Sequence, residues 1–243
     1  MKTKVNKCIR QVLNGLFPET CLLCKRFSGN HLPLCKSCHQ DLQPNHHCCQ
    51  HCALPLPADT CANICGHCLQ RPPPLDSVLA PFIYQAQLAH LVSQWKYHPQ
   101  PRLGRLLAEL WLRGLPTQLP VVDVLLPVPL NWRKLLERGF NQSAQLATLA
   151  RKQHPQMAHL PLTTRLVKRR HTQVQAGLDA QARQTNLRGA FTMAGRCDNL
   201  RIALVDDVMT TGATANELAH TLRRAGAREV HLWCLARTPA PAG

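Results

Sequence analysis

The sequence predicts an α/β protein whose parallel sheet is covered by helices, preceded by a small cysteine-rich module. Two observations support this fold class. Short apolar segments alternate with segments of helical periodicity over residues 75–243, and paired cysteines gather before residue 70. The run Arg71-Pro72-Pro73-Pro74 separates the two regions, because consecutive prolines continue neither a helix nor a central strand. We therefore expect a module at residues 1–70 and a domain at residues 75–243.

The elements of the domain follow in chain order. Apolar runs predict strands at residues 77–84, 121–128, 202–205 and 230–236. Helical periodicity predicts helices at residues 88–95, 103–115, 142–153 and 214–225, the last closed by Gly226. Residues 160–191 are polar, basic and only weakly periodic, so we expect a functional or mobile excursion there. Strands that alternate with helices through short links favour parallel pairing.

The charge is strongly positive. The chain has 29 Lys and Arg against 13 Asp and Glu, a formal net charge of +16. Residues 131–200 contain twelve Lys or Arg residues but only three acidic residues, which are Glu137, Asp179 and Asp198. A solvated surface is the ordinary explanation of scattered charge, but an excess this concentrated favours a phosphate or a nucleic acid as partner.

Membrane insertion and secretion are not expected. No stretch approaches the roughly 18 uninterrupted apolar residues of a membrane span, and the first fifteen residues lack the apolar region of a secretory signal. We expect a cytoplasmic protein. In that reducing compartment the 13 cysteines are not expected to form disulfides, so their spacing must indicate their role.

Eight cysteines form four C-x-x-C pairs with metal-ligand spacing. The pairs are Cys21/Cys24, Cys35/Cys38, Cys49/Cys52 and Cys65/Cys68. Ten residues separate the first two pairs and twelve separate the last two. Two such pairs complete a closed tetrahedral zinc site, and the metal supplies folding energy to a module with little core. We expect one or two structural zinc ions with no position open for catalysis.

The remaining cysteines and nearby histidines leave some ligands undecided. The residues that keep the second site ambiguous are Cys48, Cys61, His46, His47, His51 and His67. Cys8, Cys197 and Cys234 have no partner at ligand spacing, so free buried thiols are the better interpretation for them.

Residues 202–214 form the most informative run of the chain: an apolar strand, then Asp206 and Asp207, then a turn that opens a helix. At the carboxyl end of a parallel strand, such a turn points free N–H groups and the positive end of the helix dipole at one place, which suits a phosphate. The residues of this turn are Thr210, Thr211, Gly212, Ala213 and Thr214. The carboxylates are placed to accept hydrogen bonds from ribose hydroxyls or to hold a divalent ion against a pyrophosphate. Helix caps and a solvated acidic pair are the alternative, against which the complete run argues.

This run resembles the phosphoribosyl pyrophosphate signature of type I phosphoribosyltransferases. The resemblance implies a parallel-sheet, Rossmann-like core with that donor and Mg²⁺ as ligands. It further implies that Asp206 and Asp207 contact the ribose hydroxyls, while residues 210–214 surround the 5-phosphate.

A second loop is expected to hold the pyrophosphate. The candidates are Arg133, Arg138 and Gly139, which follow the strand end Leu126-Pro127-Val128-Pro129-Leu130. Alternatives stay open here: Arg133 as a solvated cation, Phe140 as core packing, and Asn141 as the cap of the next helix.

The double cysteine module, the donor signature and Arg138-Gly139-Phe140-Asn141-Gln142 together resemble the ComF family, which includes ComFC and GntX. Further matching pieces are Trp95-Lys96-Tyr97 and the series Gln173, Leu178, Arg183, Asn186 and Phe191. The resemblance implies the handling of imported DNA, in natural transformation or as a nutrient. It also implies single-stranded DNA as a partner and DNA-uptake proteins as further candidates.

Aromatic residues make up 5% of the chain, so base stacking would use a few of Trp95, Tyr97, Trp132 and Phe140, with electrostatics dominant. The alternative function is a catalytically active phosphoribosyltransferase of nucleotide or nucleobase metabolism. No catalytic or acceptor-recognising residue can be assigned from the sequence. A zinc-organised adaptor that senses the metabolite is a third interpretation.

Overall fold

The computed structural model describes residues 19–29, 32–98, 100–164, 167–169 and 189–240. At its centre lies a sheet in the order β1-β7-β6-β3. Its strands are β1 (Ser77–Leu79), β3 (Val124–Pro127), β6 (Arg201–Met209) and β7 (Glu229–Arg237), and β2 (Phe82–Ile83) also pairs with β7. Every one of these pairs is parallel, which confirms the predicted sheet.

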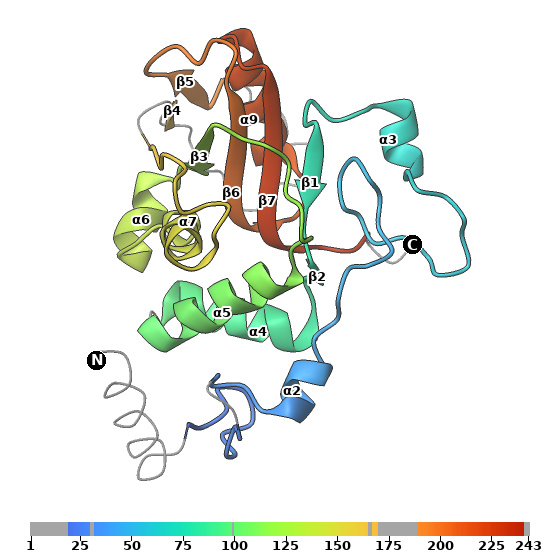
Figure 1. Cartoon of the computed structure of the whole chain (residues 1–243), viewed down its shortest axis with the longest axis vertical. Coiled ribbons are helices and arrows are strands. Elements are labelled where there is room, and N and C mark those ends of the chain that lie inside the picture. Colours follow the sequence, from blue (N-terminus) through green and yellow to red (C-terminus); the bar gives the residue numbers. More distant parts are fainter. Residues whose placement is uncertain (1–18, 30–31, 99, 165–166, 170–188, 241–243) are drawn as a thin grey trace.

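Helices cover both faces of the sheet (Figure 1). On one face lie α4 (Ala86–Tyr97), α5 (Pro101–Gly114) and α7 (Gln142–Gln153), packed with Ala203 and Val205 of β6. On the other face α9 (Ala213–Arg224) packs with Ile202 and Leu204. Alternate residues of β6 thus enter opposite cores, which is why its sequence is continuously apolar.

The cysteine-rich region contacts the domain at both of its apolar cores. The cysteines that precede and begin α2 (Lys36–Gln40) belong to the cluster formed with α4 and α5. Those around α3 (Gly66–Gln70) join the cluster on the α9 face. Between them the chain pairs with the sheet edge, because Asn45 donates to the Pro81 carbonyl at 2.8 Å and Ile83 to the Gln43 carbonyl at 2.9 Å.

Several elements differ from the sequence expectation. The strand expected at residues 77–84 is divided into β1 and β2 at Pro81, which has no N–H to donate. Strand β6 continues to Met209, beyond its expected end at 205. An unexpected helix, α6 (Trp132–Arg138), follows β3, and β4 (Val167–Arg169) pairs with β5 (Phe191–Met193) in antiparallel fashion. Most of the expected excursion at 160–191 lies outside the described residues.

Candidate functional site

The predicted phosphate loop connects β6 to α9 at the carboxyl edge of the sheet. Strand β6 ends at Met209 and α9 begins at Ala213. Gly212 is the N-cap residue, with a φ of 79° that favours glycine. Its carbonyl accepts the Asn216 N–H at 2.8 Å, while the Thr211 hydroxyl accepts the Ala213 N–H at 3.3 Å. The loop therefore presents the amino end of a twelve-residue helix, as the sequence predicts.

The two carboxylates lie near the carboxyl end of β6, and side chains of α4 and α7 contact them. Ser143 of α7 donates its hydroxyl to Asp206 Oδ1 at 2.9 Å, and the Asp207 N–H donates to the same oxygen at 2.9 Å. The Val208 N–H donates to Asp207 Oδ1 at 2.8 Å. On the other side, Lys96 Nζ of α4 lies 2.6 Å from Asp207 Oδ2. The structure thus brings β6, α4 and α7 together around one carboxylate pair.

Burial and a like charge raise the proton affinity of Asp206. Desolvation, followed by the neighbouring Asp207 carboxylate, raises the pKa of Asp206 to about 7. The hydrogen bond from Ser143 and the charge of Lys96 act in the opposite direction. Near neutral pH the pair consequently holds less than its full negative charge.

Ser143 and Lys96 were not among the predicted site residues. Ser143 directly follows the family segment that ends at Gln142, and Lys96 is the middle residue of Trp95-Lys96-Tyr97. These two matches to the family were the available signals. Ser143 and Asp206 are 63 residues apart in the sequence, so their contact depends on tertiary packing. The same holds for the contact between Lys96 and Asp207.

The candidate pyrophosphate residues lie at α6 and its end. Gly139 closes the helix with a φ of 75°, and its N–H donates to the Leu135 carbonyl at 2.8 Å. The Arg138 guanidinium stands 5.5 Å from the Tyr97 ring centroid, and its Nη1 donates to Gln142 Oε1 at 3.2 Å. Arg133 stands 5.6 Å over the ring of Trp132.

The structure decides the open alternative for Asn141 and supports core packing as one role of Phe140. The Asn141 side chain caps α7 by accepting the N–H groups of Ser143 and Ala144, at 2.9 and 3.3 Å. Phe140 packs against Trp95, with ring centroids 5.8 Å apart. Core packing therefore accounts for part of Phe140, although the ring remains partly exposed.

A groove of about 700 Å³ lies beside these residues. Its lining includes Trp95 and Phe140 at the apolar floor and the cations Arg138 and Lys152. Trp95 is fully buried, and its indole N–H donates to Gln145 Oε1 at 3.0 Å. Among the described residues that line the groove, none is acidic. The groove thus combines an apolar floor with positive charge.

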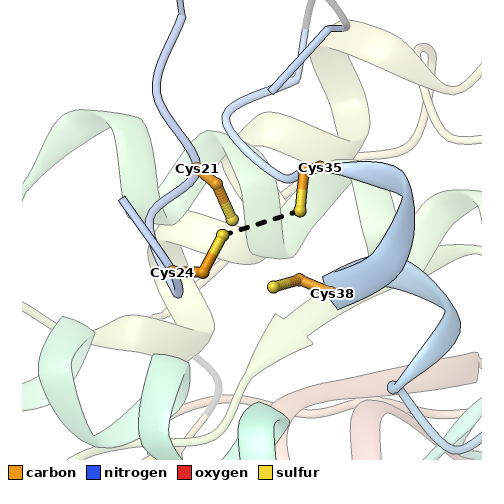
Figure 2. A group of neighbouring side chains, drawn as sticks. All are labelled: Cys21, Cys24, Cys35 and Cys38. Carbon is orange, nitrogen blue, oxygen red and sulfur yellow. Dashed lines mark hydrogen bonds between the residues drawn. The ribbon is translucent and has the colours of Figure 1, made fainter. Parts of the chain in front are cut away.

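The cysteine pairs come together in two quartets. Cys21, Cys24, Cys35 and Cys38 form the first, and their sulfur atoms point toward one another (Figure 2). Cys49, Cys52, Cys65 and Cys68 form the second. The sulfur atoms of Cys24 and Cys35 are 3.7 Å apart, and those of Cys52 and Cys65 are 3.8 Å apart. Zn–S bonds of about 2.3 Å in a tetrahedron place sulfurs about 3.8 Å apart, so both quartets fit structural zinc.

In the first quartet the surroundings of Cys24 suit a thiolate. The backbone N–H of Arg26 is the main cause that lowers the pKa of Cys24 to about 6. In the second quartet the four paired cysteines lie close enough together to hold one metal ion, whereas Cys61 is exposed and Cys48 lies outside the cluster. Within the described residues this grouping favours four thiolates as the ligands of that site.

The predicted free cysteines are confirmed where they can be seen. Cys197 is buried, and its thiol donates to the carbonyls of Leu222 and Ala225 at 3.4 Å each. Cys234 is also buried, in the strand beside Asp206. Cys8 lies outside the described residues.

Comparisons with known proteins fix the family. Residues 12–69 match the double zinc ribbon domain, as the cysteine spacing predicts. The DNA utilization protein YhgH of Salmonella typhi is 34% identical over 231 residues, which cover 91% of this chain and 98% of that protein. Competence protein F of Haemophilus influenzae is 34% identical over 213 residues, 84% of this chain and 90% of that protein. The chain belongs to the ComF family. The resemblance found in the sequence is thereby confirmed.

Solved structures show partial likeness to the ComF chain. One described as the allosteric regulatory enzyme of purine biosynthesis has a TM-score of 0.36 at 17% identity, covering 58% of this chain and 29% of that chain. A purine phosphoribosyltransferase from Pyrococcus horikoshii Ot3 has a TM-score of 0.30 at 19% identity, covering 55% and 66%. Among the described helices of the ComF chain, none has the length and hydropathy of a membrane span.

Proposed function

We propose that this ComF-family chain handles imported single-stranded DNA and binds phosphoribosyl pyrophosphate with Mg²⁺ at the carboxyl edge of its sheet. The observation that carries the proposal is the meeting of three elements there. Lys96 contacts one of the β6 carboxylates, Ser143 of α7 contacts the other, and the glycine-capped amino end of α9 follows them directly in the chain. That combination matches a ligand with hydroxyls on one part and phosphates on others.

Each part of the donor has a counterpart among these residues. Asp206 and Asp207 would accept hydrogen bonds from the ribose hydroxyls, and the N–H groups of residues 210–214 would surround the 5-phosphate. Arg138 donates a hydrogen bond to Gln142, and the next residue, Ser143, donates to Asp206. We assign the pyrophosphate to Arg133, Arg138 and Gly139, the candidates of the preceding loop. Mg²⁺ would neutralise phosphate charge when the donor is bound.

A surface strip next to this site supports a single-stranded nucleic acid partner. None of the seven residues of α6, all of them described, is buried. Trp132 is 44% exposed and Tyr97 55% exposed, and a guanidinium accompanies each ring. Bases stack on such rings while cations contact the phosphates. We call this surface the α6 strip: Tyr97, Trp132, Arg133, Arg138 and the groove beside Phe140.

The exposure of the aromatic rings shows which of the four candidates can stack on a base. Trp95 is fully buried, so it is not available to a base. Tyr97, Trp132 and the partly exposed Phe140 remain, and two of them, Tyr97 and Phe140, belong to segments that resemble the ComF family. A net charge of +16 adds a general attraction for the strand that salt will weaken.

The deciding experiment is a calorimetric titration with phosphoribosyl pyrophosphate and Mg²⁺, with and without a short single strand, while pyrophosphate release is monitored. We expect donor binding without release and a separate affinity for the strand. The matched control is Asp206→Asn with Asp207→Asn, which keeps side-chain volume and should abolish donor binding without unfolding the chain. If wild type and this variant bind phosphoribosyl pyrophosphate with equal affinity, the two carboxylates do not contact the donor. Release that depends on an added acceptor would establish a phosphoribosyltransferase instead.

A further inference from the structure

Arg237, the last residue of β7, joins two parts of the molecule that the sequence keeps far apart. Its side chain is buried, with 7% of the residue exposed. The guanidinium Nε donates to the Cys52 carbonyl at 3.0 Å. Its Nη1 donates to the carbonyls of Met209, at 3.1 Å, and of Thr210. One planar group therefore spans a chain segment of the second quartet and the start of the phosphate loop.

The chemistry of these contacts shows what the side chain does. Within the described part of the chain, the Arg237 side chain donates hydrogen bonds to main-chain carbonyls alone, and the fourth of these is the Thr238 carbonyl at 2.9 Å. A buried cation is costly unless it is well hydrogen-bonded, and a carbonyl left without a donor is costly too. Arginine is suited to this position because its donors are held in one rigid fork. The fork fixes the carbonyls of Cys52, Met209 and Thr210 relative to one another.

The packing around Arg237 is continuous between the same two parts. The four cysteines of the second quartet and Met209 belong to one apolar cluster, together with Leu218 of α9. A cavity of about 330 Å³ lies between the quartet and the loop, lined by Cys52, Met209, Thr211 and Arg237 among others. Met209 also lies under the loop, because a Cβ on Gly212 would stand 2.5 Å from its terminal methyl carbon.

The first quartet has a different environment. It packs into the cluster of α4 and α5, and among the described residues no hydrogen bond links its cysteines to residues 209–214. The two metal sites thus differ in their connection to the loop. This difference provides an internal control.

We infer that Arg237 is a positioning residue through which the metal of the second quartet orders the loop that receives the 5-phosphate. A metal ion would fix Cys52, whose carbonyl holds the guanidinium, and the guanidinium fixes the carbonyls of Met209 and Thr210. Occupancy of the second quartet then raises the affinity for the sugar phosphate. By thermodynamic linkage, the bound donor raises metal affinity by the same factor. The inference rests on the proposed function wherever the affinity for phosphoribosyl pyrophosphate is the quantity measured.

The test is a cycle of Cys65→Ser, Arg237→Met and the double variant, with Cys35→Ser as the first-quartet control. For each full-length protein we would measure zinc content, the affinity for phosphoribosyl pyrophosphate with Mg²⁺, and amide hydrogen exchange of residues 209–213. We expect Cys65→Ser and Arg237→Met each to lower donor affinity about tenfold and the double variant to lower it no further. Cys35→Ser should lose one zinc ion and keep its donor affinity.

A milder variant guards against a general loss of structure. Arg237→Lys keeps the charge but cannot present the fork, so donor affinity should fall between wild type and Arg237→Met, and the melting temperature should fall less than in Arg237→Met. Unchanged donor affinity in Arg237→Met, or equal effects of Cys35→Ser and Cys65→Ser, would overturn the inference. If the wild type binds no donor, the proposed function fails. Hydrogen exchange then decides the coupling alone, since faster exchange at residues 209–213 is required in Cys65→Ser.

Discussion

Lys96 Nζ lies 2.6 Å from Asp207 Oδ2, and both side chains are largely buried at the end of β6. The ion pair joins α4 to the strand that carries the carboxylates, so removing one partner leaves the other charged and poorly solvated. We expect Lys96→Met to lower the free energy of unfolding by about 2 kcal/mol, somewhat less than for a fully buried pair. A double-mutant cycle with Asp207→Asn, followed by urea unfolding, measures the coupling. Additive single effects would show that the contact contributes nothing.

Asp206 should give stability an unusual pH dependence. An unfolded aspartate loses its proton near pH 4, whereas burial raises the pKa of Asp206 in the fold to about 7. Between these values the folded state binds the extra proton, so the stabilisation present below pH 4 is lost as the pH rises through 7. Asp206→Asn removes that dependence. Its stability relative to wild type should increase with pH by up to about 1.4 kcal/mol per unit between pH 5.5 and 7, and level off above.

Urea unfolding with zinc present would check this behaviour, and Asp123→Asn is the matched control. The hydrogen bonds from Arg201 lower the pKa of Asp123, so it stays ionised over the same range. The control should therefore show a stability difference from wild type that is constant with pH. A constant difference for Asp206→Asn as well would mean that Asp206 is ionised throughout.

The sheet could be predicted from the sequence because burial on both faces produces a readable pattern. Strands β6 and β7 bury residues on both faces, and apolar runs identified both strands. The same rule misplaced the end of β6, since Asp206 and Asp207 interrupt the apolar run while the backbone pairing with β7 continues. Helix α6 was missed for the opposite reason: with none of its residues buried, it has no apolar stripe facing a core.

The sequence predicts residues of the candidate site only where these residues are close together in the chain or regularly spaced. The carboxylates, the loop and the cysteine quartets each lie within one short segment or a regular spacing. Ser143, Lys96 and Arg237 contact them from other elements. No local pattern encodes such contacts, which depend on how helices pack on the sheet. One family motif includes Lys96 and another ends at the residue before Ser143, but neither motif indicates the contacts with Asp206 and Asp207.

Gly212 should be required for donor binding beyond its effect on stability. Its φ of 79° is unfavourable for alanine, and an added Cβ would displace the Met209 side chain beneath the loop. We expect Gly212→Ala to cost about 1–2 kcal/mol of stability and to weaken phosphoribosyl pyrophosphate at least tenfold in calorimetry. Gly189→Ala is the control, because Gly189 has a φ of 68° and open space around it. Equal donor affinity in the two variants would argue against a phosphate in this loop.

The two quartets should bind metal independently. Replacing Cys21 and Cys24 with Ser removes two thiolates from the first quartet, and replacing Cys49 and Cys68 removes two from the second. We expect two zinc ions in wild type and one in each variant, by elemental analysis of the purified proteins. A combined variant should hold none and should melt at a lower temperature. Wild-type zinc content in either pair variant would exclude that quartet as the ligand set.

Strand binding should depend on the rings of the α6 strip. Trp132→Ala and Tyr97→Ala each remove an exposed ring that stands beside a guanidinium. A stacked base contributes about 1–3 kcal/mol, so each variant should bind a short single strand roughly fivefold to 150-fold more weakly by fluorescence anisotropy. The slope of affinity against salt should not change, because no phosphate contact is lost. Arg133→Gln should instead reduce that slope by about one phosphate contact. Phe27→Ala is the control, since Phe27 is 66% exposed and lies between the two cysteine pairs of the first quartet. An equal loss of affinity in Phe27→Ala would show that the strand does not bind specifically at the α6 strip.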